Sequence, residues 1–387
     1  GAALDDVARV SGLDRASLGV LDGVRFTGDV WAVPEGHAVL PDEPLLEVTA
    51  PVVEAQLVET LLLNRLDVAT VLTSKAVRSR LAAGGARVID FSARRTHGHH
   101  AALQAARAGG LVGFAGTSNV EAAVRYGLRA VGTMAHSFVE AFGSERSAFE
   151  AFAADQPEAT VLLVDTYDTI EGTRRAIEVM DRLGLPPTTG IRLDSGDLAD
   201  LAVRTRAMLD AAGRRQAVIV ASGALDEYAV ADLRERGAPI DVFAVGTKVG
   251  TSADAPYLDS AYKLVEYDGR PVVKTSPGKA TMPGRKQVWR RAGVPDVLAG
   301  RDEPGPPGAE ALLVEVMRGG RRVAPREGLD VARARLEADL VWLPEAARRV
   351  HEPEVPGVHV SPVLRAATEA ARGAVTFAPG PVDPPGR

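Results

Sequence analysis

Two oppositely charged side chains lie close together in the stretch Ile191–Asp197, which is an apolar run followed by polar residues. Arg192 and Asp194 are two positions apart, so at the end of a strand both would point to the same face. Arginine can clamp a carboxylate or a phosphate with two parallel hydrogen bonds. Asp194 could accept hydrogen bonds from sugar hydroxyls or lie near a cation. The same spacing also fits an internal ion pair with Ser195 as a helix N-cap, and spacing alone supports both interpretations.

Two further segments combine glycine with a hydroxyl residue between an apolar run and a helix. They are Ser222-Gly223 and Gly246-Thr247. Glycine lets the backbone approach an anion closely, and amides at a helix N-terminus point at it. The alternative is that both glycines only make tight turns. Because both segments have the same composition, we predict that they bind phosphate.

A single histidine, His136, follows residues 132–135 (Gly-Thr-Met-Ala) at the start of a helical pattern. A neutral imidazole can act as a base, a nucleophile or a phosphoryl acceptor. Isolated histidines are more often structural, so this role depends on context. His97, His99 and His100 are predicted to be surface residues, because no carboxylate lies beside them at metal-ligand spacing.

Some polar residues fit helix caps better than a site. The pattern Ser-x-x-Glu that begins at Ser118 is a capping box, and Asp-x-x-Glu from Asp168 has the same geometry. We therefore predict that these two residues are caps. Thr117 and Asp165 remain candidate site residues.

These residues follow seven apolar runs that alternate with helical patterns. Such alternation implies parallel strands, and the absence of a glycine-rich dinucleotide turn favours a (β/α) barrel over an open sheet. The segments that precede the strands, such as 108–110 and 183–190, carry no chemically distinctive residues. The asymmetry predicts a site at the carboxyl ends of the strands. The predicted strands are 87–91, 111–115, 129–131, 161–164, 191–193, 217–221 and 242–245.

Shorter strand patterns with Pro-Gly turns flank the barrel on both sides. The expected domains are a β-rich domain of residues 1–52 plus 258–345, a barrel of residues 53–257, and a C-terminal helix with a Pro/Gly-rich tail over residues 346–387. Helices are predicted over 53–64, 68–83, 331–340 and 363–372, and the tail from Pro379 to Arg387 is predicted to be disordered.

The composition narrows the function classes. The chain of 387 residues is 46% apolar and 25% charged, which is typical of a globular protein, and its net charge of −6 argues against nucleic acid or membrane as a partner. The absence of cysteine excludes thiolate zinc sites and cysteine nucleophiles. No signal peptide or spanning run is found, so a cytoplasmic location is expected. Lysine is scarce, yet Lys248, Lys274 and Lys286 occur in one region, where they would suit phosphate groups.

Taken together, the motifs resemble the nicotinate phosphoribosyltransferase family over about residues 24–290. The resemblance is carried by ten stretches in the same order: Phe26–Val30, Glu54–Asn64, Phe91–Gly98, Gly116–Val120, Gly132–Val139, Leu162–Gly172, Ile191–Leu198, Val220–Tyr228, Val245–Pro256 and Tyr262–Arg290.

The resemblance implies an α/β fold, the irregular (β/α) barrel of type II phosphoribosyltransferases with a smaller α+β/β lid domain. It also implies transfer of phosphoribose from 5-phosphoribosyl 1-diphosphate to nicotinate, giving nicotinate mononucleotide and diphosphate in NAD biosynthesis. The family couples this reaction to ATP hydrolysis, requires Mg²⁺ and acts as a homodimer. The alternatives are an enzyme for nicotinamide or quinolinate, or a catalytically silent homologue.

Family roles carry over to particular residues. His136 matches the histidine that ATP phosphorylates, which argues against quinolinate as substrate because that reaction uses no ATP. Thr133 and Arg192 match nicotinate contacts, and Asp194 matches an acid near the ribose. The other expected substrate-binding residues are Arg94 and Arg95 of a paired-arginine motif, Thr117, Ser222, Gly223, Gly246 and Thr247. Family members also carry an N-terminal segment with a tyrosine that stacks on nicotinate, and we expect this chain to start after it.

Overall fold

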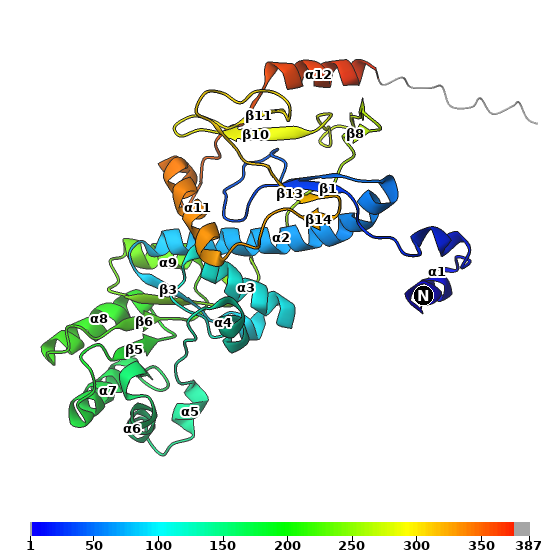
Figure 1. Cartoon of the computed structure of the whole chain (residues 1–387). Coiled ribbons are helices and arrows are strands. Elements are labelled where there is room, and N and C mark those ends of the chain that lie inside the picture. The colour runs from blue at the N-terminus through cyan, green and yellow to red at the C-terminus, as the bar shows by residue number, and fades with distance from the viewer. Residues whose placement is uncertain (1, 375–387) are drawn as a thin grey trace, which may run out of the picture. The chain divides into compact units, whose positions relative to one another are not determined.

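The computed structural model describes residues 2–374, so the predicted tail from Pro379 to Arg387 lies outside the described residues. Two compact units are present (Figure 1). Unit 1 contains the described residues of 1–63, 260–327 and 355–387, and unit 2 contains residues 64–259 and 328–354. Over residues 2–374 no helix combines the length and the apolar content needed to cross a bilayer.

The centre of unit 2 is a five-stranded parallel sheet in the order β3-β7-β6-β5-β4. Each strand is a short, apolar and mostly buried run, as expected for a sheet that is covered on both faces. Ile191, Leu193 and Ile219 are fully buried within its core. The strands are β3 (Arg87–Asp90), β4 (Val161–Leu163), β5 (Gly190–Leu193), β6 (Ile219–Ala221) and β7 (Val242–Val245).

Two of the seven predicted strands are wrong. Residues 129–131 and the residues after 115 form only isolated parallel bridges, Asp90 with Thr117 and Thr117 with Ala130. Leu111 and Val112 end a helix instead, because they pack in an apolar cluster with Ala332. The barrel is therefore irregular beyond β3.

The helices of unit 2 follow the strands as predicted, with local signals at both ends. In α7 (Thr169–Leu183), the side chain of Asp168 accepts from the amide of Glu171, and Gly184 ends the helix with φ of +58°. The predicted Asp168 cap is therefore confirmed. The other elements are η2 (Ala93–Arg95), α3 (His99–Val112), α4 (Val120–Tyr126), α5 (His136–Glu140), α6 (Glu145–Asp155), η3 (Pro157–Ala159), α8 (Leu198–Ala211), α9 (Glu227–Glu235), α10 (Thr247–Gly250), α11 (Leu329–Trp342) and η4 (Glu345–Arg348).

The two helices predicted over 53–64 and 68–83 are one helix, α2 (Val52–Ala83). The residues between them contain neither glycine nor proline, so nothing in the backbone interrupts the hydrogen-bond ladder. Its residues up to 63 belong to unit 1 and the rest to unit 2. Within unit 2, Ala76 of α2 packs against Ala332 and Leu336 of α11.

Unit 1 contains two four-stranded sheets, in the orders β14-β13-β1-β2 and β12-β10-β11-β15, and a two-stranded sheet β8-β9. Helix α12 (Pro362–Gly373) lies next to β10 and β11 (Figure 1). Its Leu364 packs in one cluster with Val288 of β10 and Leu298 of β11. Its strands are β1 (Asp29–Ala32), β2 (Leu46–Thr49), β8 (Glu266–Tyr267), β9 (Arg270–Pro271), β10 (Lys286–Arg290), β11 (Val297–Gly300), β12 (Glu310–Ala311), β13 (Val314–Arg318), β14 (Arg321–Arg322) and β15 (His359–Val360), and its N-terminal helices are α1 (Ala2–Ser11) and η1 (Ser17–Leu21).

The unit limits differ from the expected domain limits in three places. Residues 53–63 of α2 are predicted in the barrel but belong to unit 1. The predicted β-rich domain ran to residue 345, but α11 belongs to unit 2, because its apolar residues pack on α2 and α3. The predicted third segment, 346–387, is divided between the units, since α12 packs on β11 in unit 1.

Candidate functional site

Arg192, the third residue of β5, is the centre of a polar cluster at the carboxyl ends of the strands. Its Nε donates to Ser222 Oγ at 2.8 Å, and its Nη1 donates to Thr133 Oγ1 at 2.8 Å and to the carbonyl of Met134 at 3.3 Å. Its Nη2 donates to Asp194 Oδ1 at 2.5 Å. These bonds use four of the five guanidinium N–H groups. Three segments far apart in the sequence therefore meet at one side chain.

Asp194 connects Arg192 with His136. Its Oδ1 accepts from Arg192 and from the hydroxyl of Ser222, while its Oδ2 lies 3.6 Å from His136 Nε2. Burial would raise the pKa of Asp194, but the hydrogen bond from Ser222 and the charge of Arg192 outweigh it and hold the pKa below its usual value. Asp194 is therefore a carboxylate at neutral pH, and the ion pair with Arg192 that the spacing allowed is present.

His136 is the first residue of α5, and 40% of its side-chain surface is exposed. Its Nδ1 lies 3.2 Å from Thr166 Oγ1, in the segment after β4. An imidazole held between a carboxylate on one nitrogen and a hydroxyl on the other has a defined orientation. Its remaining exposure leaves room for a reactant.

Asp165 fixes the backbone at the end of β5. Its Oδ2 accepts from the amide of Asp194 at 2.9 Å and from the hydroxyl of Ser195 at 2.6 Å. Its Oδ1 is buried and has no hydrogen-bond partner among the described residues. Ser195 is not the N-cap of α8, contrary to one interpretation of the sequence, because Asp197 accepts from the amides of Ala199 and Asp200.

The glycine of the first predicted phosphate segment is required by the backbone. Gly223 has φ of +92°, and a Cβ there would lie 2.0 Å from the carbonyl oxygen of Asp194. Gly246 has φ of −139°, and a Cβ there would make only an ordinary contact of 3.4 Å with the carbonyl oxygen of Phe91, so the space around it does not require glycine. Thr247 begins the short helix α10 directly after it.

The remaining candidates differ in their surroundings. Thr117 is 1% exposed, and its hydroxyl donates to Asp90 Oδ2 at 2.7 Å and accepts from the amide of Asn119 at 3.0 Å. Asn119 caps α4, so the predicted cap at Ser118 is wrong by one residue. Arg94 and Arg95 are exposed in η2, and neither guanidinium has a hydrogen-bond or ion-pair partner in residues 2–374.

Two of the three lysines expected near phosphate have protein partners. Lys286 is 8% exposed, and its ammonium donates a hydrogen bond to the carbonyl of Gly284, also in unit 1, at 2.6 Å. Burial lowers the pKa of Lys286. Lys248 is paired with Asp226 at 2.8 Å. The contacts of Lys286 with Gly284 and Glu47 therefore favour a structural role for this lysine.

The histidines before α3 also have protein neighbours. His99 Nε2 lies 3.0 Å from Glu121 Oε2, and His100 Nε2 lies 2.5 Å from Arg65 Nη1. Across the described part of the chain, no three His, Asp or Glu side chains gather as a metal site.

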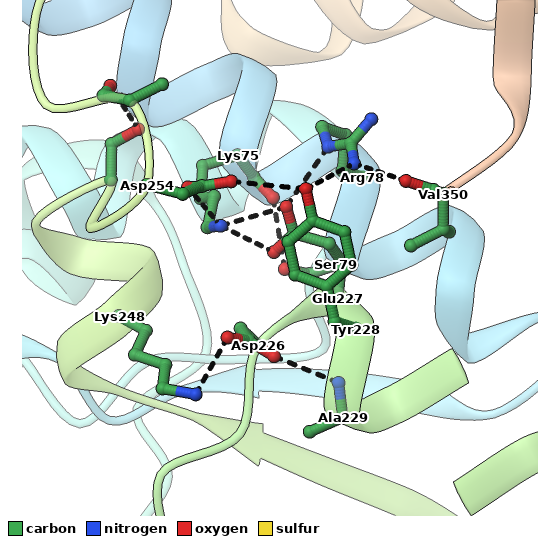
Figure 2. A network of polar contacts seen from close by, with 12 residues as sticks. Lys75, Arg78, Ser79, Asp226, Glu227, Tyr228, Ala229, Lys248, Asp254 and Val350 are labelled. Atoms are coloured by element: carbon green, nitrogen blue, oxygen red, sulfur yellow. Dashed lines mark hydrogen bonds and ion pairs between the residues drawn. The ribbon is translucent and has the colours of Figure 1, made fainter. Parts of the chain in front are cut away.

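Sequence reasoning missed one buried charge network, which Figure 2 shows. Lys75 of α2 is 4% exposed and donates to Glu227 Oε1 at 2.9 Å and to Asp254. Arg78 donates to the same Glu227 oxygen at 3.0 Å. The available signal was Lys75 itself, a lysine within an apolar helical stretch of a chain with few lysines.

Comparisons with known proteins place this geometry in a family. The model described as the nicotinate phosphoribosyltransferase (NAPRTase) family matches residues 86–290. Nicotinate phosphoribosyltransferase pncB2 of Mycobacterium tuberculosis is 51% identical over 342 residues, which are 86% of this chain and 72% of the relative. The nicotinate phosphoribosyltransferase of Bacillus subtilis is 44% identical over 271 residues, which are 67% of this chain and 54% of the relative.

Solved structures agree. The crystal structure of human nicotinic acid phosphoribosyltransferase has a TM-score of 0.81 at 27% identity and covers 95% of this chain and 88% of its own. The nicotinate-nucleotide pyrophosphorylase of Pyrococcus furiosus has a TM-score of 0.71 at 28% identity and covers 81% of this chain and 80% of its own. These likenesses confirm the predicted α/β class, the irregular barrel of type II phosphoribosyltransferases with a smaller domain. The chain belongs to the nicotinate phosphoribosyltransferase family.

Proposed function

We propose that this chain is a nicotinate phosphoribosyltransferase of NAD biosynthesis. The single observation that carries the proposal is the Arg192 cluster, in which a guanidinium is held in one orientation at the carboxyl ends of the strands. Membership of the family supports the interpretation of this cluster as a site for a pyridine carboxylate. In the reaction, the ring nitrogen of nicotinate forms a bond to C1′ of 5-phosphoribosyl 1-diphosphate, while the C1′–oxygen bond breaks and diphosphate leaves with the electron pair. The nucleophile needs no base, so the residues mainly position reactants and neutralise charge.

Arg192 supports a carboxylate-bearing substrate. One N–H group on Nη2 has no acceptor among the described residues, and the bond from Nη1 to the carbonyl of Met134 is long, at 3.3 Å. A nicotinate carboxylate could take the open donor on Nη2 and displace Met134 from Nη1, which gives the two parallel bonds of a bidentate pair. Nicotinamide has no carboxylate to offer this guanidinium, so we expect nicotinate to be preferred.

We also propose that His136 accepts the phosphoryl group of ATP, as family resemblance implies. The Asp194 carboxylate, 3.6 Å from Nε2, favours the tautomer with the proton on Nε2, which leaves the lone pair on Nδ1, beside the hydroxyl of Thr166. That nitrogen would attack the γ-phosphorus while the bond to the β-phosphate oxygen breaks and ADP leaves. Discharge of phosphohistidine to water or diphosphate would then link ATP hydrolysis to transfer.

The donor set also fits the magnesium that the family requires. Among the described residues, Asp165 offers a buried carboxylate oxygen without a partner, and Asp194, whose amide donates to the other Asp165 oxygen, supplies a second carboxylate in the cluster. Mg²⁺ prefers oxygen ligands and is usually held by one or two carboxylates together with substrate phosphates. Such an ion would supply positive charge for the diphosphate. The homodimer and the cytoplasmic location that the family suggests remain predictions.

The test supplies purified protein with 5-phosphoribosyl 1-diphosphate, Mg²⁺ and ATP, and compares labelled nicotinate, nicotinamide and quinolinate. We expect nicotinate mononucleotide, with diphosphate and ADP formed in proportion. Failure to convert nicotinate would contradict the proposed activity. His136→Ala should abolish the ADP that accompanies the reaction, and a variant that still couples ATP normally would refute the phosphohistidine. A product from nicotinamide or quinolinate alone would select the corresponding alternative substrate.

A further inference from the structure

One buried ammonium joins the segments that follow the two predicted phosphate segments. Lys75 donates to Glu227, the first residue of α9, directly after the segment 222–226 (Figure 2). It also donates to Asp254, which follows α10 and the segment 246–250. We call residues 222–226 the first loop and residues 246–250 the second loop. Lys75 of α2 is therefore bonded to a residue that follows the C-terminal end of each loop.

A second tie connects the loops directly. Lys248 Nζ in the second loop donates to Asp226 Oδ2 in the first at 2.8 Å, and Asp226 Oδ1 accepts from the amide of Ala229 at 2.9 Å (Figure 2). Burial would raise the pKa of Asp226, but the Lys248 ammonium and the Ala229 amide outweigh it and lower the pKa. The carboxylate is thus charged, held by a helix N-terminus, and able to fix Lys248.

The surrounding charges complete this arrangement. Glu227 is fully buried and also accepts from Arg78 Nε at 3.0 Å, and Tyr228 Oη lies 3.4 Å from Asp254 Oδ2. Each buried charge therefore has an opposite charge beside it. Such networks cost desolvation free energy and often add little stability, but they allow only a narrow range of geometries. We therefore expect this network to fix the positions of the segments that it connects more than to raise the free energy of unfolding.

We propose that Lys75 and the Asp226–Lys248 pair are positioning residues that set the separation of the first and second loops for the phosphate groups of the phosphoribosyl donor. The proposal rests on the proposed function. Strands β6 and β7, which carry the two loops, are hydrogen-bonded neighbours, so both loops lie at one edge of the sheet. Amide–phosphate hydrogen bonds weaken outside a narrow range of distances, so a small change in loop separation removes contacts. Lys248 is thereby assigned to hold the second loop and not to contact phosphate.

A double-mutant cycle separates these roles for Lys248. Asp226→Asn keeps a helix-capping side chain and Lys248→Met keeps the aliphatic stem. If the pair acts as a unit, each variant raises KM for the donor about fivefold, comparable to one lost hydrogen bond, and the double variant is no worse than either single one. KM for nicotinate and kcat should change less than about twofold, and Lys248→Arg should retain normal donor KM.

Different outcomes of this cycle overturn the proposal. If Lys248 contacts phosphate directly, Lys248→Met raises donor KM and Asp226→Asn does not. If the two effects multiply in the double variant, the residues act independently. Calorimetric titration of each variant with 5-phosphoribosyl 1-diphosphate provides a readout that does not depend on turnover. A wild-type protein that forms no nicotinate mononucleotide would contradict the proposed function instead, and the binding titration would still test the pair.

Lys75 is tested with a matched control on the same helix. Lys75→Met should raise donor KM while leaving nicotinate KM unchanged. If this single variant unfolds, the double variant Lys75→Met with Asp254→Asn replaces it, because it removes one of the two carboxylates that the loss of Lys75 leaves without their ammonium partner. Arg80→Met breaks the ion pair between Arg80 of α2 and Glu337 of α11, and the hydrogen bonds of Arg80 among the described residues reach Val112 and Glu337 but neither loop, so both KM values should stay unchanged. An equal rise in donor KM for Arg80→Met, or no rise for either Lys75 variant, would show that Lys75 has no positioning role.

Discussion

Gly223→Ala tests whether the end of β5 and the first loop are packed as tightly as the structure shows. The added Cβ would lie 2.0 Å from the carbonyl oxygen of Asp194, whereas Cβ atoms essentially never approach within 3.0 Å of another heavy atom. The backbone at Asp194 or at residue 223 must therefore move by about 1 Å, and a misplacement of that size in an active site can reduce the rate about 100-fold. At 1.36 kcal/mol per factor of ten, that is about 2.7 kcal/mol of transition-state stabilisation.

Gly237→Ala is the matched control, because Gly237 also has positive φ, +70°, but nothing lies within 4 Å of its added Cβ. Both variants carry the cost of a left-handed alanine, about 1–2 kcal/mol, and only Gly223→Ala adds the collision. The assay measures kcat/KM for nicotinate mononucleotide formation together with thermal unfolding. We expect a loss of about 100-fold for Gly223→Ala and little change for Gly237→Ala. Activities within about threefold of each other would refute the reasoning.

Three further predictions test the caps, the substrate contact and a pH effect. Asn119→Ala should lower the free energy of unfolding by about 1 kcal/mol in chemical denaturation, whereas Ser118→Ala should not, since only Asn119 caps α4. Arg192→Lys should raise KM for nicotinate by about tenfold or more, because a lysine cannot make the paired bonds of a guanidinium, and unchanged kinetics would contradict the carboxylate contact. Burial above all, and also the neighbouring Asp296 carboxylate, raises the pKa of Glu43 from 4.5 to about 8. Between these two pH values Glu43 is protonated in the folded chain and ionised in the unfolded chain. Stability should therefore fall as pH rises through this window, by at most about 1.4 kcal/mol per pH unit, and Glu43→Gln should remove that part of the slope in denaturation curves recorded from pH 5 to 8.

The sequence was most informative where the site depends on which residues directly follow each strand. Residues after parallel strands gather at one edge of a sheet, so Arg192, Asp194 and Ser222 could be predicted to meet without any tertiary detail, whereas Thr133 was expected there only from the family resemblance. The strand predicted over 111–115 fails for the opposite reason. A short apolar run fits a strand or a helix end equally well, and here the choice depends on Ala332 and Leu336, more than 200 residues further along the chain.

Pairing between distant charges is the part that sequence could not supply. Lys75 and Glu227 are 152 residues apart, and no periodicity indicates which acid a buried lysine will meet. The same limit applies to Glu43, whose neighbour Asp296 lies more than 200 residues further along the chain. The types of these residues are visible in the sequence, but their partners are defined only by the fold.

For Arg192 and Asp194, the internal ion pair and the substrate contact need not be alternatives. A guanidinium with only 13% of its side-chain surface exposed needs acceptors when no substrate is bound, and Asp194, Ser222 and Thr133 supply them. The same acceptors hold its plane in one orientation while leaving one N–H open on Nη2. Because the bonds are already made, little side-chain entropy remains to be lost when a carboxylate arrives. The ion pair therefore prepares Arg192 for an anionic ligand, and removing Asp194 should weaken nicotinate binding although it removes a negative charge from the site.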